Sequence, residues 1–315
     1  MLFRLTSFLI LFFMLILMAN TAQATCTRNA AGAIIVDNDA SGDPPQMATD
    51  TENGLGDQCS EIPDAYKIKF FKMGICTDSP ASLDFSSCSY MLESSDGIDH
   101  VIRMPNVGSL ATGEFDIPTN TYNYMVAVMS NRFGIMHTET FSEELRGLTG
   151  TGKTCWSIAD KVTAYTNETI NNGLDSHDAT ATDDAPSTNV LECGSASDAD
   201  PGFSYEVINV FSNACSSWEE DMTSITMSNG VASAKLLQTD NTAATACTNA
   251  TRMLWVIDLN TPIDVTKQSQ FTLEFKLTDA VSVDMTVDSG TGYAVKMGAD
   301  PVTAILTTTE PGGKD

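Results

Sequence analysis

The sequence contains one match to the phosphate-binding loop pattern G-x-x-x-x-G-K-[ST], at residues 147–154 (GLTGTGKT). Nucleotide chemistry needs a buried strand before such a loop and a helix after it, so that backbone N–H groups surround the phosphates. Here the preceding residues 137–146 are polar and acidic. We therefore predict a surface turn in which Lys153 is dispensable for folding. The alternative is nucleotide binding, with magnesium held by Asp258.

A second candidate site is an acidic loop with calcium-like spacing. Asp37, Asp39 and Ser41 place oxygen atoms at positions 1, 3 and 5, a glycine follows at position 6, and Asp43 adds a further carboxylate. A complete EF-hand would have glutamate at position 12, where this chain has alanine. These four residues are the candidate ligands, and calcium is the one cofactor that the sequence suggests. The alternative, which we favour, is a solvated acidic linker.

Residues with the spacing of a catalytic site are scarce. The histidines His100, His137 and His177 lack the spacing of zinc proteases, and the sequence has no G-x-S-x-G nucleophile motif. Pairs of carboxylates for glycoside hydrolysis are numerous, but sequence spacing does not give their separation in space. We therefore expect a protein that is not an enzyme.

The first residues have the features of a secretory signal peptide. Arg4 precedes an apolar run at residues 5–18, and small residues at Ala22 and Ala24 suit a cleavage site after residue 24. The apolar run is shorter than the ~20 residues that a membrane-spanning helix needs. We expect cleavage after residue 24, no membrane span afterwards, and secretion to the extracellular space or cell surface, with the periplasm as the alternative.

Eight cysteines, an even number, follow this leader. In an exported chain such a count predicts four disulfides, whereas a zinc site would need closely spaced pairs that are missing here. The expected pairing joins neighbours along the chain: Cys26–Cys59, Cys76–Cys88, Cys155–Cys193 and Cys215–Cys247.

The chain is strongly acidic, with 41 Asp and Glu against 16 Lys and Arg and a net charge of −25. Such a surface repels a phosphate backbone, so the composition argues against nucleic-acid binding. It also disfavours anionic membranes, and it suits solubility and attraction of divalent cations.

Several segments alternate apolar and polar side chains with the period of a β-strand. Residues 66–70 alternate regularly, and the apolar face switches at the pair Phe70-Phe71. Residues 122–129 are apolar on both faces, which predicts a strand buried on both sides. Residues 271–297 predict an antiparallel meander of three strands. Further candidate strands are residues 133–141, 205–211 and 252–259, and a short helix is expected at 156–165.

These patterns predict an all-β fold of one or two antiparallel β-sandwich units with disulfide-stapled loops. The expected divisions are a signal peptide (1–24), an acidic N-terminal segment rich in Asp, Gly and Pro (25–64), a first sandwich-like domain (65–147), a connection rich in Thr, Ala and Asp (148–204), and a second sandwich-like domain (205–315).

The sequence therefore favours a non-enzymatic surface or extracellular structural protein, such as a filament, coat or adhesin subunit. The alternative is a periplasmic or extracellular module that binds a glycan or another ligand, and a secreted hydrolase ranks third. Expected partners are further copies of the chain or another surface component. The last β-prone segment, residues 301–308, either closes its own sheet, which we favour, or adds to a neighbouring subunit.

Overall fold

The computed structural model describes residues 25–36, 58–103, 116–164, 191–207, 225–227, 230–245, 249–267, 269–288, 292–299 and 302–309. Within these ranges the regular elements are strands, apart from two short 3-10 turns, η1 (Pro80–Ser82) and η3 (Ala196–Asp198). The all-β prediction is confirmed. No helix in these ranges is long and apolar enough to cross a membrane. The predicted signal peptide lies outside the described residues.

The largest sheet has nine strands in the order β11-β12-β13-β4-β2-β5-β10-β8, with β3 paired to β2. Almost all neighbours are antiparallel, and β8 and β10 run parallel. The strands are β2 (Ala65–Cys76), β3 (Cys88–Arg103), β4 (Asn120–Ser130), β5 (Arg132–Met136), β8 (Val162–Ala164), β10 (Ser204–Val207), β11 (Ile225–Met227), β12 (Gly230–Leu237) and β13 (Arg252–Val265).

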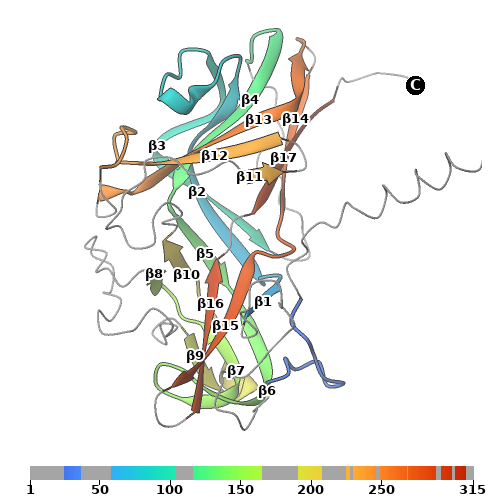
Figure 1. Cartoon of the computed structure of the whole chain (residues 1–315), viewed down its shortest axis with the longest axis vertical. Helices are drawn as coiled ribbons and strands as arrows, with labels where there is room; N and C mark the ends of the chain where they lie inside the picture. The colour runs from blue at the N-terminus through green and yellow to red at the C-terminus, as the bar shows by residue number, and fades with distance from the viewer. Residues whose placement is uncertain are drawn as a thin grey trace, which may run out of the picture.

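Two smaller sheets pack against the nine-stranded sheet, and all three contribute to one apolar cluster that includes Phe70, Phe141 and Leu273. The six-stranded sheet has the order β1-β15-β16-β6-β7-β9. Figure 1 shows β4, β12 and β13 toward one end of an elongated molecule and β6, β7 and β9 toward the other. The strands are β1 (Gln58–Glu61), β6 (Thr138–Arg146), β7 (Thr151–Ser157), β9 (Leu191–Gly194), β15 (Val281–Asp288) and β16 (Gly292–Ala299), and the third sheet pairs β14 (Gln270–Lys276) with β17 (Thr303–Thr309).

In the long strand β2 the alternation of buried and exposed residues shifts by one position where the sequence predicts a switch. Tyr66 and Phe70 are buried before the switch and Met73 after it. The pairing of β2 with β3 and with β4 shifts register between Phe70 and Lys72, which is the mark of a β-bulge. One extra residue in the strand therefore shifts the inward-pointing positions from even to odd numbers, and residues on both sides of the bulge face the same apolar cluster.

Strand β4 is buried on both faces, as the sequence predicts. Met125 and Met129 belong to the main cluster between the sheets. Val126 and Val128 lie in a separate cluster on the opposite face, together with Leu254 of β13. The nine-stranded sheet therefore has an apolar patch on its outer face as well as an apolar inner face.

The candidate strand at residues 133–141 is divided between two sheets. β5 belongs to the nine-stranded sheet and β6 to the six-stranded sheet, and His137 lies between them. The chain crosses from one layer to the other at this residue. Alternation predicts which side chains are buried, but it does not reveal that the strand changes partners.

Two other local predictions are wrong. β15 and β16 form the expected hairpin, but β14 pairs with β17 rather than with β15, so the three-strand meander does not exist. The helix expected at 156–165 is replaced in its described part by the end of β7 and by β8, because pairing with β9 and β10 overrides local propensity.

The chain segments expected as two domains share their sheets. β13 of residues 205–315 pairs with β4 of residues 65–147, and β15 pairs with β1 of the N-terminal segment. Strand pairing is a long-range choice that depends on packing, and period-two patterning carries no information about it.

Three of the four predicted disulfides are confirmed, and the fourth pair, Cys215 and Cys247, lies outside the described residues. Cys26–Cys59 ties the N-terminal segment to β1, Cys76–Cys88 joins the end of β2 to the start of β3, and Cys155–Cys193 joins β7 to β9. Such bonds persist in oxidising compartments, so they indicate an extracytoplasmic environment.

Prediction: deleting residues 301–315 should lower the free energy of unfolding by about 3 kcal/mol or more, as expected for exposing one or two buried apolar side chains. β17 closes its own sheet on β14, and Val302 is buried against Leu273 and Phe275. Urea denaturation measures the change. Deleting only residues 310–315 should leave stability unchanged, and an unchanged stability of the longer deletion would contradict this role of β17.

Candidate functional site

The first four residues of the phosphate-loop match form a turn between two strands, as predicted, and its last four residues belong to the second strand. β6 ends at Arg146 and β7 begins at Thr151, and the two strands pair as an antiparallel hairpin. The carboxylate of Glu192 already occupies the anion-receptive part of this turn. It accepts hydrogen bonds from the backbone N–H of Gly150 at 2.7 Å and from the hydroxyl of Thr149 at 2.8 Å. A residue of the same chain thus takes the place that a phosphate would need.

Close packing of β9 accounts for the glycines of this motif. A Cβ atom on Gly147 would lie 2.3 Å from the backbone nitrogen of Cys193, and one on Gly152 would lie 2.1 Å from the carbonyl oxygen of Gly194. Burial acts to raise the pKa of Glu192, but its hydrogen bonds with Thr149 and with backbone N–H groups outweigh burial and lower it. The turn is therefore a self-contained structural unit.

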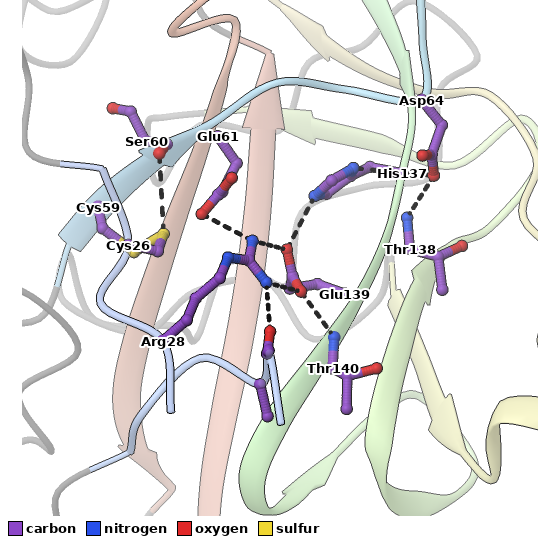
Figure 2. Close-up of polar contacts among 12 residues, drawn as sticks. Cys26, Arg28, Cys59, Ser60, Glu61, Asp64, His137, Thr138, Glu139 and Thr140 are labelled. Carbon is purple, nitrogen blue, oxygen red and sulfur yellow. Dashed lines mark hydrogen bonds and ion pairs between the residues drawn. A yellow bond between two sulfur atoms is a disulfide. The ribbon is translucent and has the colours of Figure 1, made fainter. Parts of the chain in front are cut away.

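The chain crossing at His137 is held by backbone and side-chain bonds. The backbone N–H of His137 donates to the hydroxyl of Ser157 at 3.0 Å, and the Ser157 N–H donates to the His137 carbonyl at 3.0 Å. The Ser157 hydroxyl in turn donates to the carbonyl of Gly202 at 2.6 Å. The imidazole is fixed among charged residues that we call the sheet junction: Arg28, Glu61, Asp64, His137 and Glu139 (Figure 2).

A bidentate ion pair lies at the centre of the sheet junction. The guanidinium of Arg28 donates to both oxygens of Glu139, at 2.8 and 2.7 Å, and lies 2.8 Å from Oε1 of Glu61 (Figure 2). His137 Nε2 is 3.5 Å from Glu139 Oε2, and its Nδ1 is 3.8 Å from Asp64 Oδ2. Parallel N–H···O bonds of this kind are among the strongest in proteins, and they fix orientation as well as distance.

These contacts keep Glu139 ionised at low pH. Burial alone would raise its pKa, but hydrogen bonds from Arg28, His137 and the Thr140 N–H lower it to about 2. The hydrogen bond and the charge of Glu139 raise the pKa of Arg28. A catalytic acid or base needs a pKa near the working pH, so the junction has the properties of a structural ion pair.

A further carboxylate connects the two large sheets. Glu206 of β10 is buried and accepts a hydrogen bond from the Ala299 N–H of β16 at 2.6 Å. Gly298 allows this approach, because a Cβ atom there would lie 2.4 Å from Oε2 of Glu206.

A different arrangement is found on the outer face of the nine-stranded sheet, where we define the cationic hollow by Lys67, Lys69, Asp99, Arg132 and Tyr205. These residues line a hollow of about 380 Å³. Strand register explains their grouping, because Lys67 of β2, Gly134 of β5 and Tyr205 of β10 lie side by side. Lys69 and Arg132 project from the same face, two residues away along their strands.

Hydrogen bonds and ion pairs organise one side of the hollow. Lys67 Nζ donates to the Tyr205 hydroxyl at 3.0 Å and lies 3.0 Å from Asp99 Oδ2, while Lys69 Nζ lies 3.5 Å from the other oxygen of Asp99. The Lys67 ammonium also stands over the rings of Tyr205 and Phe203, at 5.5 and 5.7 Å. The sequence predicts outward-facing lysines on β2, but it does not reveal that Arg132 and Tyr205 join them.

The remaining predicted site residues do not come together. His100 of β3 packs against Phe275, with ring centroids 5.9 Å apart, while His137 belongs to the sheet junction. His177 and the calcium candidates Asp37, Asp39, Ser41 and Asp43 lie outside the described residues. Within the described part of the chain, no group of three or more His, Cys, Asp and Glu side chains has the geometry of a metal site.

Comparisons of this chain with family models, with curated proteins and with solved structures give no significant match.

Prediction: replacing Glu139 by Gln should remove an acid-sensitive part of the stability. The pKa of Glu139 falls from 4.5 to about 2 on folding, so its ionised form stabilises the fold above pH 4.5. This contribution, about 3 kcal/mol, is lost as the pH falls from 4.5 towards 2. The free energy of unfolding of Glu139→Gln should therefore lie below wild type at pH 7 and approach it near pH 2.

The matched control for that experiment is Glu274→Gln, at an exposed position of β14. Its stability should follow the wild-type curve at every pH in a series of urea denaturations. Parallel curves for wild type and Glu139→Gln between pH 5 and pH 2 would show that Glu139 is not the titrating group.

Prediction: Gly152→Ala should destabilise the protein by about 1–3 kcal/mol, the usual range for overpacking. Its Cβ atom would overlap the carbonyl of Gly194 and force β9 away. Lys153→Ala should change stability by less than about 0.5 kcal/mol, because this side chain is exposed. Thermal unfolding measures both. Nucleotide binding in the micromolar range, lost in Lys153→Ala, would contradict the structural role of this turn.

Proposed function

We propose that this chain is a secreted, non-enzymatic structural protein of the cell surface or extracellular space, and that it assembles with further copies of itself through the edge strand β3. The three disulfides support an exported framework. The carboxylates of Glu139, Glu192 and Glu206 are engaged in framework hydrogen bonds, which supports a structural role for them.

The observation that carries this proposal is the exposed edge formed by β3. This strand has 16 residues, and among the described strands it pairs only with β2. Ile98 and Val101 are 50% and 39% exposed, so this edge presents apolar side chains to solvent. An edge of this kind presents unpaired backbone N–H and C=O groups that a strand of another chain can bind.

The charges on β3 are complementary to a second copy of the same strand. In an antiparallel pair centred on Val101, Asp99 lies opposite Arg103 of the partner subunit, and the two-fold axis repeats this contact. Opposite charges directly across a strand pair contribute roughly 0.2–1 kcal/mol each. The two valines at the centre add an apolar contact. The same patch thus serves both subunits, as a two-fold interface requires.

Prediction: Val101→Lys should weaken self-association about tenfold or more, because it places two like charges opposite each other at the centre of the strand pair. Sedimentation velocity over a concentration series measures the association. The control is Val231→Lys, the same substitution at a valine of β12 that is 37% exposed. Both variants should keep the wild-type melting temperature.

Arg103→Glu gives a second test, since it turns both charge pairs into repulsions, and Arg146→Glu on β6 is its control. The proposal is wrong if the wild-type protein stays monomeric at the highest concentration. It is equally wrong if Val231→Lys disrupts association as much as Val101→Lys.

A further inference from the structure

Positive charge in this acidic chain is concentrated on one face. Six of the 16 lysines and arginines lie around β2 on the outer side of the nine-stranded sheet. Several are stacked on aromatic rings, with the Arg252 guanidinium 3.7 Å from the centroid of Phe71 and Lys72 Nζ 4.8 Å from that of Tyr90. The six are Lys67, Lys69, Lys72, Arg103, Arg132 and Arg252. Stacking by itself holds a cation in place without neutralising it, although Lys72 also pairs with Glu93 at 2.7 Å.

Arg132 is the cation of the hollow whose charge is not compensated. Lys67 and Lys69 share the carboxylate of Asp99, whereas no ion pair or side-chain hydrogen bond of Arg132 occurs within the described part of the structure. Arg132 is half-buried, and burial lowers its pKa. A desolvated guanidinium is costly without an anionic partner, and its planar fork matches the two oxygens of a carboxylate or sulfate group.

The volume of the hollow and its other lining residues indicate the size and the chemical groups of the rest of the ligand. Its volume of about 380 Å³ lies within the range of small-molecule sites and is too large for an inorganic ion alone. Ser130, Tyr205 and Thr251 line it together with the charged groups, so the lining combines ionic and hydroxyl groups with apolar side-chain surface. A polar ring with several hydroxyl groups and one acidic group satisfies both requirements.

We propose that the cationic hollow binds an acidic sugar unit, a pyranose that bears a carboxylate or sulfate group, with Arg132 holding the acidic group and the hydroxyl-bearing wall contacting the sugar hydroxyls. This site goes beyond the assembly function, and it shares only Asp99 with the proposed β3 interface. The three cations and one carboxylate leave two net positive charges at the site. A neutral sugar leaves these charges without a counterion, so the site selects acidic ligands.

The test is a calorimetric titration of the purified protein with D-glucuronate, D-glucose and sodium sulfate at constant ionic strength. Glucuronate should bind with saturation and at least tenfold more tightly than either glucose or sulfate. Arg132→Gln should weaken glucuronate binding about tenfold or more, in keeping with the strength of charge-assisted bidentate bonds. The control Arg146→Gln removes an arginine from the exposed face of β6 and should leave the affinity unchanged.

A variant with little effect on folding completes the design. The side chain of Lys69 is 42% exposed, so Lys69→Gln should keep the wild-type melting temperature and weaken glucuronate binding several-fold. The proposal is overturned if glucuronate fails to saturate at tens of millimolar, if glucose or sulfate binds as tightly, or if Arg146→Gln weakens binding as much as Arg132→Gln. Val101 lies directly opposite Lys67, so Val101→Lys adds a positive charge beside the hollow, and it should abolish self-association without weakening glucuronate binding.

Discussion

The ion pair between Arg28 and Glu139 is the contact on which the junction of the two large sheets depends. The chain leaves the nine-stranded sheet at His137 and enters the six-stranded sheet at Thr138, so Glu139 is carried into the interior. An unpaired carboxylate at this position would cost several kcal/mol. Its partner comes from 111 residues earlier in the chain, which means that the N-terminal segment must dock before the crossing is stable. The Cys26–Cys59 disulfide lowers the entropic cost of that docking, because it already holds this segment against β1.

The distribution of charge follows from the same free-energy cost of burying an unpaired charge. Carboxylates that are buried, such as Glu139 and Glu206, have hydrogen-bond donors from other strands or segments. Several cations lie against a carboxylate or an aromatic ring, and Arg132 is an exception. Charges beyond about 8 Å are largely screened at physiological ionic strength. The net charge of −25 therefore disfavours a polyanion that lies along the acidic surface, but acidic groups far from the cationic hollow do not cancel its local field. A small acidic ligand in the hollow interacts mainly with the charged groups that line it.

Local features of this fold could be predicted from the sequence, and long-range ones could not. The face switch at Phe70-Phe71 and the double burial of β4 follow from side-chain periodicity alone. The expectation that neighbouring cysteines pair along the chain is confirmed for the three described disulfides. The pairing of β14 with β17, the division of β5 from β6 and the shared sheets depend on which strands pack together, and periodicity does not report that. For the same reason the candidate site escaped prediction, since Lys67, Arg132 and Tyr205 meet only through strand register.

The phosphate-loop pattern shows why a motif needs its structural context. A tight glycine-rich turn leaves several backbone N–H groups converging on one point, and such a point attracts an anion whatever the fold. In a nucleotide-binding protein the following helix helps to place a phosphate there. Here the Cys155–Cys193 disulfide brings β9 beside the hairpin, and Glu192 supplies the anion from within the chain.

Smaller turns repeat this solution, with Asp84 accepting from the Ser86 N–H and Asp240 from the Thr242 N–H, each at 3.0 Å. The Ser86 hydrogen bond lowers the pKa of Asp84, and hydrogen bonds from the Thr242 hydroxyl and N–H lower the pKa of Asp240. A β-rich chain has many turns and no long helices in its described part, so most of its unpaired N–H groups lie in loops. Acidic side chains are the strongest acceptors for such groups. Part of the acidity of this protein is therefore a structural requirement of its turns, in addition to its effect on solubility.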